Sequence, residues 1–306
     1  MKIYIPDVNE SWVVDRFREE FYDYNSKITT NDIKTADIIW IIAPWIWKKI
    51  KRKNLKNKKV LCTIHHFEEK DFEKEGLKNF NKLDKYVDQY HVISELSFKQ
   101  LKSLTLKNVT KIPFWVNQNI WFDISDTKIL RENYNIDTQD FVVGSFQRDT
   151  EGFDLVSPKL IKGPDRFIEI IEKLKYKNPL VLLSGKRRQY IINRLEKLEV
   201  RYKYFEMVDV KVLNELYNCL DLYIVTSRVE GGPQSIVECA TNKTPIISTD
   251  VGIASEILSE NSIFNMNNFE KAIPDIETAF KNSSPLRIPQ GFEKFNEMFN
   301  LMHFKK

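Results

Sequence analysis

The second half of the chain alternates short apolar runs with longer segments whose apolar residues recur every three to four positions. Short apolar runs predict buried strands, and the longer amphipathic pattern predicts helices. We expect strands at 141–146, 180–185, 201–207, 222–227 and 244–249. The helices expected between them lie at 164–175, 187–198, 212–220 and 234–242. This alternation indicates βαβ units and a parallel sheet with helices on both faces.

The first half alternates in the same way, with less regular spacing. Its expected strands are 2–6, 36–44, 59–66 and 89–95, and its expected helices are 11–24, 45–55, 77–86 and 97–104. The stretch 116–139 is polar without a sustained period, which predicts a linker. A chain of 306 residues exceeds one comfortable core, so we expect two α/β domains, at 1–120 and 121–306.

The tail carries an apolar stripe at helical spacing, which predicts a core-packing helix over 290–306. We assign this helix to the C-terminal domain, with packing back on the N-terminal domain as the alternative. Doubly wound domains bind ligands outside the carboxyl ends of their strands, so two facing domains would form a cleft lined by strand-to-helix loops. Seven of the nine glycines fall between Gly144 and Gly252, mostly at strand ends or helix starts, where a backbone can approach a ligand closely.

Cysteine usage and the N-terminus favour a cytoplasmic protein. The three cysteines are scattered and have no metal-ligand spacing, which is typical of free thiols in a reducing compartment. The segment "MKIYIPDVNE" does not have the layout of a signal peptide. The most apolar run, Ile38 to Trp47, has ten residues with a proline, whereas a membrane span needs about 20.

Positive charge is concentrated in the first half. Residues 1–120 carry 22 Lys and Arg against 16 Asp and Glu, whereas the rest carries 25 against 27. The segment Lys48 to Lys59 has eight bases in twelve residues. It is either a solvated helix face or a surface that attracts an anionic acceptor or membrane. With Trp45 and Trp47 beside it, peripheral contact of residues 45–59 with the inner membrane face is the alternative to a freely dissolved protein.

The segment "SRVEGGPQSIVECA" places two glutamates around a turn. A strand ends at Ser227, Gly231 and Gly232 make the turn, and Pro233 suits the first helical position. The helix amides that follow lack internal partners and form a site for a phosphate; they belong to Gln234, Ser235 and Ile236.

A diphosphate at this helix end would leave a ribose near Glu238, about 5–8 Å along the axis, and Glu230 would face the other end of the ligand. Two solvated charges near a helix start are the alternative interpretation.

Four motifs in order resemble the retaining glycosyltransferases of family 4, whose two-domain fold is called GT-B. The Glu-x7-Glu pair stands as Glu230 and Glu238, with Gly231 after the first glutamate. The segments "TPIISTDVGIASEIL", "FVVGSFQRD" with "KLIKGPDRFIEII", and "IPFWVNQNIWF" resemble the strands, helix start and interdomain segment of that family. The resemblance covers most of 140–260 and only patches of the N-terminal half. It implies two facing Rossmann-like domains with a cleft between them and a C-terminal helix.

The resemblance also implies roles for residues. Arg148 and Lys162 would neutralise the donor's diphosphate, Glu238 would bind its ribose, and Glu230 would lie at the hydroxyls of the transferred sugar. His65 would reach the reaction centre, and it is counted with both the catalytic and the acceptor residues. Gly144 and Gly231 would give the donor room, and the remaining candidates are Gly185 and Gly232 for the donor and Asn9 and Trp12 for the acceptor.

Sugar transfer develops negative charge on the departing diphosphate, which cationic side chains stabilise. The sequence contains no Asp-x-Asp, so we expect no metal and no cofactor other than the donor. We predict a retaining hexosyltransferase that uses a UDP- or GDP-hexose and a glycan or lipid-linked acceptor. Departure from the front face and a covalent intermediate both remain open. The alternatives are a non-catalytic nucleotide-sugar-binding protein and a sugar transferase acting on nucleic acid.

Overall fold

A computed structural model of the chain describes residues 1–10 and 13–304 and divides it into two compact units. The first unit combines Met1–Trp115 with Ile288–Lys306, and the second is Val116–Arg287. The division therefore falls at Trp115, before the predicted boundary at 120. The tail belongs to the first unit, which corrects its assignment to the C-terminal domain and agrees with the alternative.

The first unit contains a parallel sheet in the order β1-β2-β3-β4-β5. Its strands are β1 (Ile3–Tyr4), β2 (Ile38–Ile41), β3 (Lys59–Ile64), β4 (Gln89–Val92) and β5 (Asn108–Lys111). A parallel bridge joins Ile3 to Thr29, so the chain first crosses to one side of β1 before it starts β2 on the other side. This reversal makes the unit doubly wound and places a topological switch point beside β1, where the loop at 6–10 begins.

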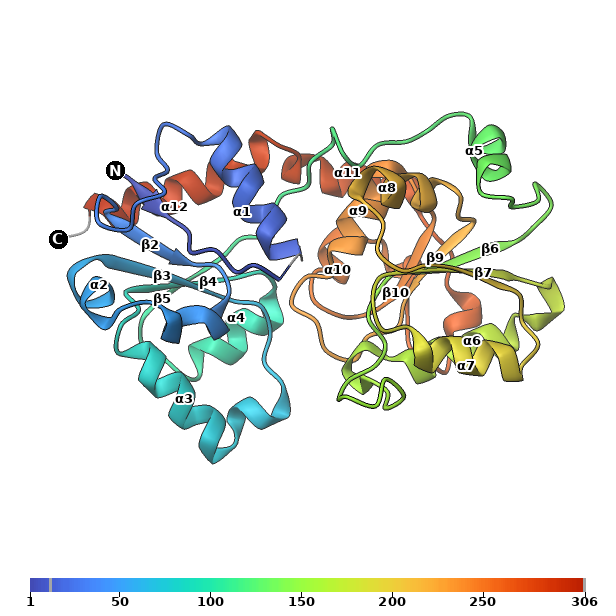
Figure 1. Cartoon of the computed structure of the whole chain (residues 1–306), viewed down its shortest axis with the longest axis horizontal. Helices are drawn as coiled ribbons and strands as arrows, with labels where there is room; N and C mark the ends of the chain where they lie inside the picture. Colours follow the sequence, from blue (N-terminus) through green and yellow to red (C-terminus); the bar gives the residue numbers. More distant parts are fainter. Residues whose placement is uncertain (11–12, 305–306) are drawn as a thin grey trace. The chain divides into compact units, whose positions relative to one another are not determined.

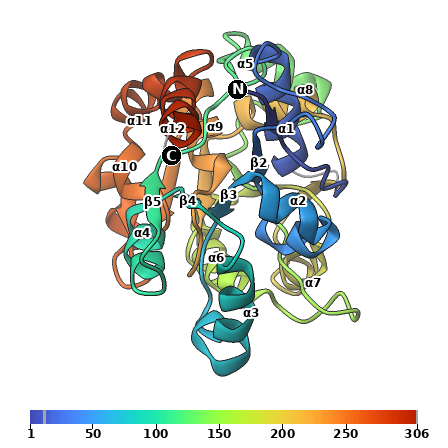
Figure 2. The ribbon, with the colours of Figure 1, turned by 90° about the vertical axis from the view of Figure 1, so that its left-hand side faces the viewer.

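Helices cover both faces of this sheet (Figures 1 and 2). One face carries α1 (Val13–Tyr24) and α12 (Glu293–Phe304), and the other carries α3 (Lys74–Asp84) and α4 (Glu95–Lys102). The ring of Trp40 lies 5.4 Å from Phe295 and 5.3 Å from Phe299, which fastens α12 to β2. The helix predicted at 45–55 is interrupted, because Ile50 is extended and Lys51 is not helical between η1 (Pro44–Lys49) and α2 (Arg52–Asn57).

The second unit contains a six-stranded parallel sheet in the order β11-β10-β9-β6-β7-β8. Its strands are β6 (Val142–Ser145), β7 (Leu180–Ser184), β8 (Tyr202–Phe205), β9 (Leu222–Val225), β10 (Ile246–Thr249) and β11 (Ile263–Phe264). Numbered within the unit, this is the 3-2-1-4-5-6 order of dinucleotide-binding folds, and the order reverses between β6 and β9.

Helices α6 (Pro164–Lys173) and α7 (Gln189–Lys197) cover one face of the second sheet (Figure 1). Phe167 and Ile171 of α6 and Ile191 of α7 are buried against Val143 and Val181. The other face carries α8 (Val210–Asn218), α9 (Gln234–Asn242), α10 (Ala254–Ile257) and α11 (Ile276–Ser283). Short 3-10 turns complete the chain: η2 (Glu69–Phe72), η3 (Leu160–Lys162), η4 (Lys175–Lys177), η5 (Glu260–Ser262), η6 (Phe269–Lys271), η7 (Ser284–Leu286) and η8 (Gln290–Phe292).

The predicted linker is wrong over most of its length. Residues after Val116 belong to the second unit and contain α5 (Thr127–Asn133), which Asp126 caps by accepting from the amide of Ile129 at 3.1 Å. Arg131 of this helix donates to the carbonyl of Cys219 at 2.8 Å. A helix this short has too few turns to show a period in sequence.

The three cysteines are free and buried, in keeping with the prediction of free thiols. No helix within residues 1–10 and 13–304 has the length and apolar character needed to cross a bilayer.

Candidate active site

The loops that follow β6 and β9 meet at the switch point of the second sheet. Gly144 of β6 pairs with Tyr223 of β9, so the next residues of both strands leave the sheet side by side. The β6 loop carries Arg148 and leads to Lys162, and the β9 loop carries Glu230. The fold therefore brings together two loops that the sequence separates by 68 positions at Lys162 and Glu230.

Lys162 and Glu230 form an ion pair between the Nζ and Oε1 atoms. Their side chains are 20% and 10% exposed, so both are largely screened from solvent yet reachable. Ser227 donates to the same Glu230 oxygen at 3.2 Å, and Gln147 donates to the carbonyl of Lys162 at 2.9 Å. Ser227 and Gln147 are site residues that the sequence did not indicate, because their polar side chains have no spacing signature.

The turn before α9 is held from behind by the loop after β10. Gly252 has a φ of +59°, and a Cβ there would lie 2.7 Å from the carbonyl oxygen of Gly231 and 2.9 Å from Pro233. Thr249 also donates to the carbonyl of Ser227 at 2.7 Å. A glycine at position 252 is needed for this close approach, which fixes the Gly231 and Gly232 turn against the sheet.

The start of α9 differs by one residue from the prediction. Pro233 is the N-cap rather than the first helical residue, and its carbonyl accepts from the amide of Ile236 at 3.0 Å. The amide of Ile236 is therefore not available to a ligand, which corrects that assignment. The amides of Gln234 and Ser235 are the first two of the helix, which an α-helix leaves without internal partners.

Glu238 lies on α9 and is 5% exposed. Its Oε2 accepts from the hydroxyl of Tyr217 at 3.0 Å. Burial, and then the neighbouring Tyr223 and Glu238, raise the pKa of Tyr217 well above its usual value, so this residue stays a neutral donor. The ring of Tyr217 lies 4.8 Å from that of Phe146 at the end of β6. Tyr217 thus orients the carboxylate predicted for the ribose, a role that sequence spacing does not reveal.

Arg148 faces a different set of partners from Lys162. Its Nε donates to the carbonyl of Thr150 at 2.7 Å. Burial and the nearby Arg187 guanidinium lower the pKa of Arg148, so two like charges lie close together at this loop. Such a pair of cations is stabilised when an anion binds between them.

Arg188, the next residue after Arg187, has a structural role. Its side chain is fully buried, pairs with Asp149 at 3.0 Å, and donates to the carbonyls of Ser145 at 2.5 Å and Ser184 at 2.7 Å. It therefore joins the ends of β6 and β7. The sequence did not single it out, because a lone arginine at a helix start resembles a solvated charge.

Two predicted glycines differ in what surrounds them. A Cβ on Gly144 would lie 2.3 Å from Leu220, so the space beside this glycine is filled by protein and does not make room for a donor. Gly185 has a φ of +89° and its carbonyl accepts from Tyr204 at 2.9 Å. Gly185 thus serves the turn after β7.

The predicted residues of the N-terminal domain lie in the first unit. The Nε2 of His65 is 2.8 Å from the carbonyl oxygen of Ile42, and its ring lies 5.8 Å from that of Trp45. Asn9 has a φ of +57°, and its amide donates to Asp15 at 3.0 Å, which closes a loop without glycine. Trp12 lies outside the described residues.

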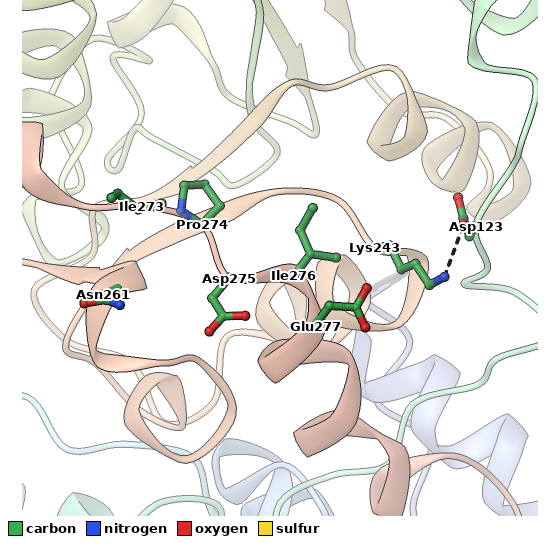
Figure 3. A pocket seen from close by; sticks show the side chains of 8 residues that line it. All are labelled: Asp123, Lys243, Asn261, Ile273, Pro274, Asp275, Ile276 and Glu277. Carbon is green, nitrogen blue, oxygen red and sulfur yellow. Dashed lines mark ion pairs between the residues drawn. The ribbon is translucent and has the colours of Figure 1, made fainter.

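A hollow of about 650 Å³ opens at the C-terminal end of α9, beyond the predicted donor residues (Figure 3). Lys243 there pairs with Asp123 at 3.6 Å. The other residues that line the hollow are Asn261, Ile273, Pro274, Asp275, Ile276 and Glu277. None of the predicted site residues lines it. Among the residues that the structure describes, no group of three or more His, Cys, Asp or Glu could hold a metal.

Sequence comparison assigns a class to the second unit. Residues 156–289, which include Lys162, Glu230 and Glu238, match the family described as "Glycosyl transferases group 1". This segment is a glycosyltransferase domain. The prediction of a glycosyltransferase is confirmed at this level. No curated protein matches the sequence significantly.

Solved structures resemble the chain along nearly its whole length. Alr3699/HepE from Anabaena, in complex with UDP and glucose, is 13% identical with a TM-score of 0.78, covering 98% of this chain and 100% of that chain. Sucrose-phosphate synthase from Thermosynechococcus elongatus is 15% identical with a TM-score of 0.70, covering 94% of this chain and 78% of that chain. A glycosyltransferase from Rickettsia africae is 15% identical with a TM-score of 0.66, covering 98% and 84%. The predicted GT-B class of two Rossmann-like α/β domains is confirmed.

Proposed function

We propose that this glycosyltransferase moves a hexose from a nucleoside-diphosphate sugar to an acceptor hydroxyl, with retention of configuration and without a metal. The observation that carries the proposal is the contact between Lys162 and Glu230 at the switch point. A cation suited to a diphosphate and a carboxylate suited to sugar hydroxyls lie together where this fold binds ligands. Without a donor the two charges neutralise each other.

In this proposal each residue of the site meets one part of the donor. The diphosphate takes the place of Glu230 as the partner of Lys162 and also reaches the amides of Gln234 and Ser235. Arg148 supplies a second cation, and Glu238, oriented by Tyr217, accepts from the ribose. Negative charge grows on the diphosphate as the glycosidic bond breaks, so these cations stabilise the transition state more than the ground state.

UDP is the nucleotide that the structural neighbours favour, and a glycan is the acceptor class. Among the structures similar to this chain, Alr3699/HepE was solved with UDP-glucose, and a TarM variant of S. aureus was solved with fondaparinux, alpha-GlcNAc-glycerol and UDP. UDP-glucose is therefore the first donor to test, with GDP-sugars as the predicted alternative. Within the first unit, His65 stays the proposed catalytic and acceptor residue, and Asn9 a proposed acceptor residue.

Thermal unfolding with UDP, GDP, ADP and their sugars tests the donor. A ligand at 100 times its dissociation constant adds about 2.7 kcal/mol of stability, which gives a clear shift of the midpoint. We expect UDP and UDP-glucose to shift the midpoint of the wild type but not that of Glu238→Ala. Hydrolysis and transfer of UDP-glucose that persist unchanged in both Glu238→Ala and Lys162→Ala would refute the assignment.

We also propose a peripheral contact of residues 45–59 with an anionic membrane surface. Between residues 38 and 67 the sequence contains no Asp or Glu. The segment 45–59 begins with the half-exposed Trp45. Its exposed bases are Lys48, Lys49, Lys51, Arg52, Lys53 and Lys56. A basic patch with an aromatic residue beside it suits an anionic lipid interface, where a lipid-linked acceptor would be found.

A further inference from the structure

The segment that carries Lys162 is fastened to the segment that carries Glu230 along several residues. The carbonyl of Ile161 accepts from the amides of Arg228 at 2.7 Å and Val229 at 3.2 Å. Thr226 donates to the carbonyl of Gly163 at 2.8 Å. The two loops thus run together from the end of β9 outward, through two backbone contacts and the Thr226 hydroxyl.

The side chain of Arg228 closes the outer end of this contact. Its Nη1 and Nη2 donate to the two carboxylate oxygens of Asp165 at 2.8 and 2.6 Å, and its Nη1 also donates to the carbonyl of Leu160 at 2.8 Å. The two side chains are 34% and 33% exposed. A two-pronged arginine–carboxylate contact fixes orientation as well as distance, which a single contact does not.

The protonation state of this pair agrees with the contact. Burial would raise the pKa of Asp165, but the hydrogen bonds and charge of Arg228 outweigh it, so the pKa lies below its usual value. The hydrogen bond to Asp165 raises the pKa of Arg228. Both groups are therefore charged at neutral pH.

Arg228 holds the positions on both sides of Lys162. Leu160 and Asp165 flank Lys162 along the chain, and Glu230 follows Arg228 by two positions. A release of this contact would let the Lys162 segment move relative to Glu230. A displacement of about 1 Å at a reacting centre costs on the order of a hundredfold in rate, so this contact bears on catalysis without touching the substrate.

We propose that Arg228 and Asp165 are positioning residues that hold the Lys162 segment against the Glu230 segment, so that both side chains lie where a nucleoside diphosphate sugar binds. The inference rests on the proposed function and deepens it. In this proposal the pair acts through the segments that it joins, because the guanidinium donates to Asp165 and Leu160 and the carboxylate accepts from Arg228.

Calorimetric titration with UDP tests the pair. We expect Arg228→Ala and Asp165→Ala each to weaken UDP binding about tenfold, and the double variant to bind no worse than either single one. The exchange of charges in Arg228→Asp with Asp165→Arg restores binding to within a few fold. The matched control is Arg201→Ala, which breaks a 2.7 Å contact with Asp140 elsewhere in the same unit and leaves UDP binding unchanged.

Testing Arg228→Ala in the Lys162→Ala variant as well as in the wild type distinguishes a positioning role of Arg228 from direct contact with UDP. In Lys162→Ala, the further substitution Arg228→Ala has no additional effect if Arg228 acts through Lys162. An equal loss in both backgrounds would show that Arg228 itself binds the ligand and would overturn the inference. Arg228→Lys keeps the charge but not the two-pronged contact; we expect intermediate binding with an unchanged thermal midpoint, which a purely structural role would not produce.

The two proposals fail in different ways. If Lys162→Ala weakens UDP binding but Arg228→Ala does not, only the positioning role is refuted. If the wild type binds none of the nucleoside diphosphates, or Lys162→Ala binds UDP as the wild type does, the proposed donor site is refuted together with the role of the pair.

Discussion

At the scale of single residues, the site depends on partners that orient the predicted side chains. The sequence predicts Lys162, Glu230 and Glu238 from their motifs, and the fold places the first two in contact. It does not predict Tyr217, because a tyrosine on an amphipathic helix has the same pattern as a core residue. It also assigns Gly144 wrongly to the donor, since only the structure shows Leu220 beside it.

Tyr217 provides a test of the orientation of Glu238. Tyr217→Phe removes the donor to Glu238 and leaves the ring. A buried acceptor that loses a partner costs about 1–3 kcal/mol, so we expect a lower thermal midpoint and UDP binding weakened about tenfold. Tyr202→Phe removes a comparable hydroxyl, which contacts Glu196 at 2.9 Å at the surface, and should change neither. If Tyr217→Phe binds UDP as tightly as the wild type, the orientation of Glu238 by Tyr217 does not contribute to UDP binding.

His91 predicts how stability depends on pH. It is fully buried, with its Nδ1 atom 3.0 Å from the hydroxyl of Thr63 and its Nε2 atom 2.8 Å from the carbonyl oxygen of Ile112. Burial, together with the charge of His65, lowers its pKa from 6.5 to about 3, although the hydrogen bond to Ile112 opposes this. In the folded state His91 stays neutral, whereas in the unfolded state it takes up a proton below pH 6.5. Its contribution to the free energy of unfolding is therefore fully present above pH 6.5 and is lost as the pH falls towards 3.

Through His91, the free energy of unfolding falls by at most about 1.4 kcal/mol for each pH unit between pH 6.5 and 3. Urea unfolding at several pH values should show a shallower acid dependence for His91→Gln than for the wild type. His303→Gln, on the last helix, is the control. An identical slope in His91→Gln and the wild type would show that other groups cause the loss.

At the scale of elements, the amphipathic pattern predicts nine of the strands and most helices, including α9, whose end at Asn242 it places correctly. It misses β5 because "NVTK" is polar at the sheet edge, where alternation is not required by burial. It misses α5 because the helix is short. It cannot show that Arg188 joins β6 to β7, since this contact depends on the sheet order rather than on the sequence around it.

The start of α6 depends on the absence of a side chain at Gly163. This residue has a φ of +64°, and a Cβ would lie 1.9 Å from the carbonyl oxygen of Thr226. Gly163→Ala adds a steric conflict of about 1–3 kcal/mol to a backbone cost of about 1–2 kcal/mol, and it displaces Lys162. We expect a large loss of stability in urea unfolding and of UDP binding.

Gly152→Ala is the matched control for that substitution. Its φ is +70°, but the nearest atom to an added Cβ, an Asp154 oxygen, lies 3.8 Å away. It should therefore show the backbone cost of about 1–2 kcal/mol alone. Equal destabilisation by both substitutions would contradict the close contact between Gly163 and Thr226.

At the scale of the whole molecule, each unit has its own sheet, core and switch point, and the last helix returns to the first unit. The stripe on that helix was visible in sequence, but its partner was not, because an apolar face is compatible with either domain. Contact of α12 with Trp40 decides the matter. Charge is likewise uneven between the units, and the bases at 48–59 belong to the first.

Vesicle sedimentation tests that basic segment. We expect binding to vesicles rich in phosphatidylglycerol but not to phosphatidylcholine alone, and release at about 1 M salt, where the Debye length is about 3 Å. Replacing Lys51, Arg52 and Lys53 by Gln should weaken binding about a hundredfold, at about 1 kcal/mol for each charge.

The matched control replaces three exposed lysines of the second unit, Lys197, Lys211 and Lys281, by Gln. Equal loss of binding in both triple variants would indicate a general charge effect and refute a docking role for residues 45–59.

Calorimetric titration of UDP into the wild type, Lys162→Ala and Lys211→Ala tests the central claim most directly. The switch point of the second unit, with Lys162 as its cation, is predicted to bind UDP in the wild type and in Lys211→Ala, whose substitution lies on the exposed surface of α8. Lys162→Ala is predicted to bind at least tenfold more weakly. UDP binding of the same strength in Lys162→Ala and the wild type would contradict the account.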